Sequence, residues 1–312
     1  MDNRNLFCCV LGLGLVVLLV SACAGQAPAT AAAPRIVPPA ATQTVAPPTY
    51  TPTEIPPTPT GVHRDIKIAY VIIADAQTQY SDLIRSFQTG VDKDLADRDI
   101  AVTWATITEN DESLRSLQSN PKGYDIVMLA IGQPPADISA ILRGWLQSGG
   151  IIWAFDNGTF STWRNKDLFG GLLPGADVNW EPPEQVQVMV QGLNVLPYDD
   201  ASPLAKGVTG DINVTGNVTV SQDATTKVIY ANLTSFDRAL DASTTPLLKA
   251  QKVGEAVIGG QTPQPSGWVV VGLAKMVEKG QAVVLPFLAL DLVPVQQFQA
   301  NLIEWGLMQV GK

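Results

Sequence analysis

The fold is decided by residues 124–158, whose sequence is YDIVMLAIGQPPADISAILRGWLQSGGIIWAFDNG. The runs Tyr124–Ile131 and Gly150–Phe155 are largely apolar, which is typical of strands buried on both faces of a parallel sheet. A strand, a helix and a second strand in this order predict a right-handed crossover between parallel strands. The helix is indicated by apolar residues at intervals of three and four, namely Ile138, Ile141, Leu142, Trp145 and Leu146.

The residues before this stretch repeat the alternation of strand and helix. Ile66–Ala74 is a further apolar run, and Ile100–Ile107 has the alternating pattern of a strand. Apolar residues on one face predict a helix over 83–95, and Glu112–Leu117 predicts a short helix before the third strand. The sequence therefore predicts an α/β fold with a doubly wound, mainly parallel sheet.

The second half of the chain predicts mostly strands, separated by Asn, Gly, Asp and Thr as in hairpins. A last helix carries Phe298, Leu302 and Trp305 on its apolar face. We expect this β-rich segment to be an insertion into the same domain. The predicted strands are Gln185–Val190, Ile212–Val220, Val228–Ala231, Glu255–Ile258, Val269–Val277 and Val283–Leu288, with Lys279-Gly280 as the turn between the last two.

A different composition marks the beginning of the chain. Residues 1–23 are predicted to be a lipoprotein signal peptide, because their apolar run is too short and too rich in glycine for a good membrane span. The run ends in Val20-Ser-Ala-Cys23, which resembles the lipobox of bacterial lipoproteins. That resemblance implies diacylglycerol, with fatty acids such as palmitate, on the thiol of Cys23. Residues 24–62, rich in Pro, Thr and Ala, are predicted to be a disordered tether, since they have too little apolar surface to fold.

Charge and cysteine content exclude several classes of function for the predicted domain, residues 63–312. The net charge of −9 argues against binding nucleic acid, whose phosphates require a basic surface. All three cysteines, Cys8, Cys9 and Cys23, precede the domain, and the single histidine is His63. The domain therefore has no thiol nucleophile and no cysteine metal site, and we predict neither a metal nor a cofactor.

Residues 124–158 are similar to the strand–helix–strand centre of the class I glutamine amidotransferase-like superfamily, which includes trehalose-utilisation-type and gliding-associated extracytoplasmic domains. Asp200–Gly207, Lys279–Phe287 and Asn301–Trp305 fit the same resemblance. It implies a flavodoxin-like α/β domain over 63–312. Active members use a cysteine on a strand-to-helix elbow, activated by a histidine. This chain has neither residue inside the domain, so we predict that the domain is not an enzyme of this kind.

Polar residues follow three of the predicted parallel strands. Asp75 and Gln77 follow the first strand, and Gln133 follows the third. Asp156 and Asn157 follow the fourth. Ligands of open α/β sheets bind beyond the carboxyl ends of the strands, at the switch in strand order, so these five residues are the predicted ligand site. The alternative is that they are helix caps and turn formers, which these residue types suit equally well.

Three functions are compatible with this sequence. The first is a lipid-anchored protein on the extracytoplasmic face of the cell membrane, whose non-catalytic domain binds a ligand, a carbohydrate or a protein partner, or scaffolds an envelope complex. The second is a glycan hydrolase that uses only carboxylates, such as Asp75 and Asp156. The third is a solute-binding lipoprotein of a transporter, for which two similar α/β lobes are expected. We predict the first.

Overall fold

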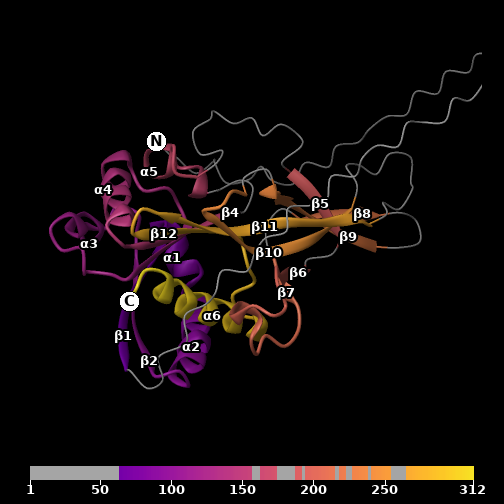
Figure 1. Cartoon of the computed structure of the whole chain (residues 1–312), viewed down its shortest axis with the longest axis horizontal. Coiled ribbons are helices and arrows are strands. Elements are labelled where there is room, and N and C mark those ends of the chain that lie inside the picture. Colours follow the sequence, from indigo (N-terminus) through magenta and orange to yellow (C-terminus); the bar gives the residue numbers. More distant parts are fainter. Residues whose placement is uncertain are drawn as a thin grey trace, which may run out of the picture. The chain divides into compact units, whose positions relative to one another are not determined.

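The computed structural model describes the chain from His63 onward, and these residues belong to one compact unit, Ile55–Lys312 (Figure 1). The signal peptide, the tether, Asn157 and the predicted strand Glu255–Ile258 lie outside the described residues. The described stretches are 63–156, 162–173, 187–191, 194–214, 218–222, 227–237, 240–253 and 265–312.

The first half alternates between strands and helices as predicted, and the four predicted strands agree with the structure to within two residues at each end. The apolar runs form strands because both of their faces are covered. The elements are β1 (Arg64–Ile72), α1 (Ala74–Gln79), α2 (Ser81–Ala96), β2 (Ile100–Ile107), α3 (Glu112–Arg115), η1 (Ser116–Gln118), β3 (Ile126–Ile131), α4 (Ala136–Gln147) and β4 (Ile151–Asp156).

The second half is rich in strands and ends in a long helix, as predicted. The elements are η2 (Thr162–Arg164), α5 (Lys166–Phe169), β5 (Gln187–Gln191), β6 (Asn194–Pro197), η3 (Pro203–Ala205), β7 (Ile212–Asn213), β8 (Val218–Gln222), β9 (Lys227–Thr234), β10 (Thr244–Val253), β11 (Pro265–Val277), β12 (Gly280–Pro286) and α6 (Val293–Gln309).

Several details of the second half differ from the prediction, and the short strand β6 is one that was not predicted. The strand β10 was not predicted, since Pro246 interrupts its pattern and the register with β11 shifts just after this residue. The predicted strand Ile212–Val220 is two elements, β7 and β8. The last turn consists of Glu278 and Lys279, because Val277 pairs with Gly280, the first residue of β12.

The strands form a sheet in the order β2-β1-β3-β4-β12-β11-β10-β5-β9-β8, and β6 pairs with β10 and β7 beside it. The pairs from β2 to β12 are parallel, whereas those from β12 to β8 are antiparallel. The β-rich segment therefore continues the parallel sheet (Figure 1). The α/β fold is confirmed.

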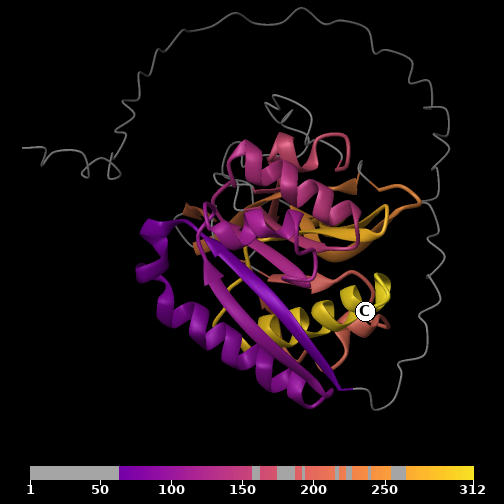
Figure 2. The same ribbon diagram turned by 90° about the vertical axis from the view of Figure 1, so that its left-hand side faces the viewer.

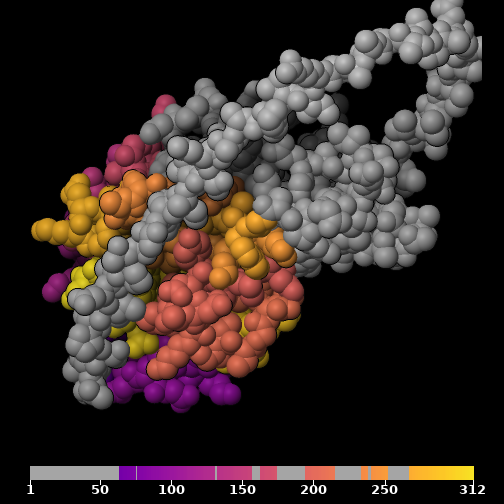
Figure 3. Space-filling view, turned by 45° about the vertical axis from the view of Figure 1, so that its right-hand side comes forward, coloured from indigo at the N-terminus to yellow at the C-terminus, as the bar shows by residue number. Residues whose placement is uncertain are grey.

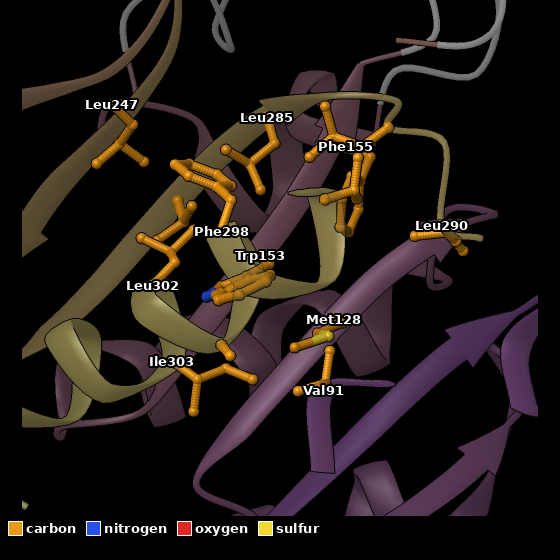
Figure 4. Close-up of a cluster of buried hydrophobic side chains, with 14 of the residues drawn as sticks. Val91, Met128, Trp153, Phe155, Leu247, Leu285, Leu290, Phe298, Leu302 and Ile303 are labelled. Atoms are coloured by element: carbon orange, nitrogen blue, oxygen red, sulfur yellow. The ribbon is translucent and has the colours of Figure 1, made fainter. Parts of the chain in front are cut away.

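Helices cover both faces of the parallel strands (Figure 2). The apolar sides of α2 and α6 pack on one face, and those of α3, α4 and α5 pack on the other. Trp153 lies in the core between the sheet and the helices α2 and α6, near Met128 and Phe298 (Figure 4). Trp145 and Trp305, which lie on the predicted apolar faces of two helices, are also buried.

The segment 194–214 packs at the surface beside β10 and against α6 (Figure 3). Asn301 of α6 holds this segment, since its buried amide donates to the carbonyl oxygens of Leu204 (2.9 Å) and Lys206 (2.8 Å). Its own oxygen accepts from Nη2 of Arg98 at 2.6 Å. Because both polar atoms of this buried amide are bonded, Asn301 joins α6, the turn after α2 and the segment at little desolvation cost.

A carboxylate just before β10 makes the free energy of unfolding depend on pH. Asp241 accepts from the hydroxyls of Ser243 and Thr244, both at 2.7 Å, and from Nζ of Lys275 at 2.9 Å. These bonds hold the pKa of Asp241 well below its usual value. A lowered pKa contributes stability above the unfolded pKa of about 3.9, and this contribution disappears as the pH falls.

We therefore expect Asp241→Asn to lose less stability than the wild type between pH 7 and pH 3. Urea unfolding of both proteins at the two pH values measures the difference. Replacing Asp82, whose side chain is almost fully exposed, by asparagine is the control. An equal loss in Asp241→Asn and the wild type would contradict this role of the carboxylate.

Candidate functional site

The carboxyl ends of the parallel strands lie at one edge of the sheet, as the sequence predicts. At this edge, Ile72 of β1 pairs with Ile131 of β3, and Asp156 of β4 pairs with Pro286 of β12. The backbone N–H of Phe287 also donates to the carbonyl oxygen of Asp156 at 3.1 Å. The strand ends are thus joined in two pairs, β1 with β3 and β4 with β12.

Between these two pairs, β3 and β4 diverge. Their last paired residues are Leu129 and Ala154, although both strands continue for two more residues. The buried hydroxyl of Thr162 in η2 lies at this point, where it accepts from the N–H of Phe155 at 2.7 Å. The same hydroxyl is 3.1 Å from the carbonyl oxygen of Leu129, to which it can donate. A side chain therefore replaces the sheet hydrogen bond where the two strands separate.

A second buried side chain, Asn165, fixes the loop that follows β3. Its amide nitrogen donates to the carbonyl oxygen of Pro134 at 3.3 Å and to the hydroxyl of Ser139 at 3.0 Å. The hydroxyl of Ser139 donates to the same carbonyl at 2.9 Å. Asn165 also caps α5, since its oxygen accepts from the N–H of Leu168. The loops after β3 and β4 are held together through η2 and α5.

We call Gln133, Asp156, Thr162, Arg164 and Asn165 the β3–β4 corner. Asp156 is only 7 % exposed, whereas Gln133, at the end of the neighbouring strand, is exposed. The guanidinium carbon of Arg164 lies 5.2 Å from the centre of the Trp163 ring. A carboxylate, a guanidinium and an amide are groups that orient a polar ligand by hydrogen bonds.

The structure brings together only some of the predicted site residues. Gln133 and Asp156 lie at neighbouring strand ends. Gln77 lies in α1, and its amide donates to the carbonyl oxygen of Thr106 in β2 at 3.2 Å. This bond ties α1 to β2, the edge strand of the sheet. The backbone of Asp75 belongs to α1, but its side chain lies outside the described residues, as does all of Asn157.

The switch in strand order lies between β1 and β3, one strand away from the corner. At this switch the chain approaches itself closely, because Gly132 has a φ of 105° and a Cβ atom there would overlap the side chain of Ile73. The side chain of Ile73 thus fills the space beside Gly132. The polar groups instead gather where β3 and β4 diverge.

The only imidazole of the chain lies at the opposite edge of the sheet. His63 precedes β1 and is bonded to Asp99 at 2.9 Å, and it lies 3.3 Å from Asp65. The hydrogen bond that the imidazole donates to Asp99, together with the charges of both carboxylates, raises the pKa of His63. A strand of nine residues separates His63 from the carboxyl edge, a distance of about 30 Å. This imidazole therefore cannot activate a nucleophile at the corner.

No family model matches this chain, and no curated protein matches its sequence. Solved structures similar to it include two ThuA-like proteins. The one from Bacteroides uniformis has 12% sequence identity and a TM-score of 0.41, over 84% of this chain and 95% of its own. The one from Parabacteroides merdae has 14% identity and a TM-score of 0.42, over 80% of this chain and 91% of its own.

The glutaminase domain of Trypanosoma brucei CTP synthase is also similar, with 10% identity and a TM-score of 0.42, over 77% of this chain and 93% of its own. The α/β assignment itself rests on the strand order, and no residue role is transferred from these proteins.

Thr162, Arg164 and Asn165 were not predicted as site residues from the sequence. Asn165 could have been found, because an asparagine directly before a short run of helix-forming residues is a helix N-cap signal. Nothing in the sequence marks Thr162, since its role arises only where β3 and β4 separate. Trp163 is buried in η2, and its ring packs edge-on against that of Phe236, with 5.5 Å between the ring centres.

Proposed function

We propose that this chain is a membrane-anchored extracytoplasmic lipoprotein, and that its α/β domain binds a ligand or partner at the β3–β4 corner without cysteine or histidine catalysis. The observation that carries the binding role is the divergence of β3 and β4 beside the buried carboxylate of Asp156. The position of His63, about 30 Å away at the opposite edge, supports the absence of an imidazole base.

The anchor in this proposal is Cys23, and it rests on the sequence from Val20 to Cys23. A diacylglycerol on this thiol, with a third acyl chain on the amino group, gives the several chains that stable anchoring requires. Among the residues that the structure describes, no helix is both long and apolar enough to cross a bilayer. Residues 24–62 would then hold the domain away from the membrane.

The domain architecture bears on the alternative of a transporter's solute-binding protein. Such a protein is expected to have two similar α/β lobes, whereas all the described strands except β6 and β7 are joined in one continuous path from β2 to β8. We therefore favour a binding domain that acts through one edge of a single sheet.

Replacing Cys23 by alanine is expected to abolish the anchor, because no other thiol would carry the diacylglycerol. In bacteria fed labelled palmitate, Cys23→Ala should lose the label and accumulate as precursor or leave the membrane fraction. The matched control is Cys9→Ala, which removes a thiol of the apolar run and should keep both label and location. Mass spectrometry of a mature wild-type protein without acyl groups would contradict the anchor.

A further inference from the structure

A tryptophan outside the corner is exposed. Among the tryptophans whose side chains the structure describes, Trp268 of β11 alone is exposed, at 53%, and the others are buried or half-buried. An exposed indole has no part in the core, so its removal does not threaten the fold. Next to Trp268, the position of Gly267 is open, since a Cβ there would meet nothing within 4 Å.

Polar groups surround this indole. Lys249 of β10 lies diagonally across from Trp268, with Nζ over one face of the indole at 5.5 Å from the ring centre, which leaves the other face for a sugar. The same Nζ is 3.6 Å from Oδ1 of Asp200. Gln251, which is exposed, pairs directly with Trp268 across the strands. The ring thus lies among an amide, an ammonium and a carboxylate, each able to bond a hydroxyl group.

The register of the strands relates Trp268 to the β3–β4 corner. Asp156 pairs with Pro286, and the last paired residues of β12 and β11 are Val284 and Leu273. Continued by two residues, this register puts Pro286 level with Val271. Trp268 is three residues farther along β11, roughly 10 Å beyond the carboxyl edge, and two strands to the side of β4, roughly another 10 Å. It shares a face of the sheet with Val270, which belongs to the same core as Phe236 and Trp163.

From these observations we propose that Trp268 is an aromatic platform for a pyranose ring of a neutral glycan, which extends from there toward the corner. This inference rests on the proposed function and names the ligand class. A pyranose has an apolar face, which stacks on an indole, and a rim of hydroxyl groups, which the amide, ammonium and carboxylate bond.

The surroundings favour a sugar over other ligands. A protein partner would bury a more apolar surface, whereas the described neighbours of Trp268 across the strands are the amide of Gln251 and the ammonium group of Lys249. An anionic polymer would meet a protein of net charge −9 and the carboxylate of Asp200. The paired charges of Lys249 and Asp200 cancel, which suits a neutral chain.

Calorimetric titration of the full-length chain in detergent micelles with cellohexaose and chitohexaose tests this inference. We expect one of the two hexaoses to bind, and Trp268→Ala to weaken its binding about tenfold or more. Trp268→Phe, which keeps a smaller ring, should fall in between. Val293→Ala removes an exposed apolar side chain of α6 and should bind as the wild type does.

The outcomes separate this inference from the proposed function. If neither hexaose binds the wild type, or if Trp268→Ala binds as well as the wild type, the platform is wrong, whereas the corner can still bind another ligand. If the hexaose is shortened during the titration and Asp156→Asn stops this, the platform stands but the non-catalytic function is wrong. Thermal unfolding of each variant confirms that it is folded.

Discussion

Gly280→Ala is expected to destabilise the domain by about 3 kcal/mol. A Cβ atom at Gly280 would overlap the backbone carbonyl oxygens of Leu146 and Gly150, where the end of α4 meets the start of β12. Backbone atoms cannot rotate away as a flexible side chain can, so the helix and the strand would have to separate. The free energy of unfolding in urea measures this loss.

The matched control for this substitution is Gly144→Ala. Gly144 lies inside α4, and a Cβ atom there would meet nothing within 4 Å. Alanine should therefore raise the free energy of unfolding by about 0.5–1 kcal/mol, since it restricts the unfolded chain and favours the helix. Equal changes in the free energy of unfolding for the two substitutions would show that a Cβ atom at position 280 does not clash with the backbone around α4.

Thr162→Val is expected to cost about 2 kcal/mol and to weaken ligand binding at the corner. Valine has the same shape as threonine but no hydroxyl, so it leaves the N–H of Phe155 buried without its partner at the point where β3 and β4 diverge. Because Phe155 directly precedes Asp156, the carboxylate should also lose its fixed position. Urea unfolding and calorimetric titration measure the two effects.

Thr162→Ser keeps the hydroxyl and removes only a methyl group, so it should retain most of the binding that Thr162→Val loses. If valine and serine were equally harmful, the methyl group and its packing would explain the effect. In that case the hydrogen bonds of the hydroxyl would not be what fixes the ends of β3 and β4.

The sequence predicted the parallel half of the sheet because its strands are buried on both faces. Such strands are continuous apolar runs, as in Ile151–Phe155, and their order along the chain fixes their shared carboxyl edge. The positions of Gln133 and Asp156 at neighbouring strand ends follow from that topology alone. Two of the five predicted site residues thus lie close together because parallel strands, which the sequence predicts, end at the same edge of the sheet.

Other features depend on contacts that no local pattern records. The strand β10 contains Pro246 and has charged and polar residues among its apolar ones, so its periodicity is weak. The bond from Thr162 to β4 requires the pairing of β3 and β4 to end early, which depends on both strands. The exposure of Trp268 depends on which residues cover β11, and its sequence neighbours Val269–Val271 alone would predict burial.

Amide hydrogen exchange of the full-length chain, with and without saturating cellohexaose or chitohexaose, tests the central claim most directly. We expect slower exchange after β3 (residues 131–135), around Asp156 and η2, and at the start of β11, with the hexaose recovered intact. Protection confined to β8 and β9, at the far end of the sheet from β1, would contradict binding at the carboxyl edge. Shortened products of the hexaose would contradict a domain that binds without catalysis.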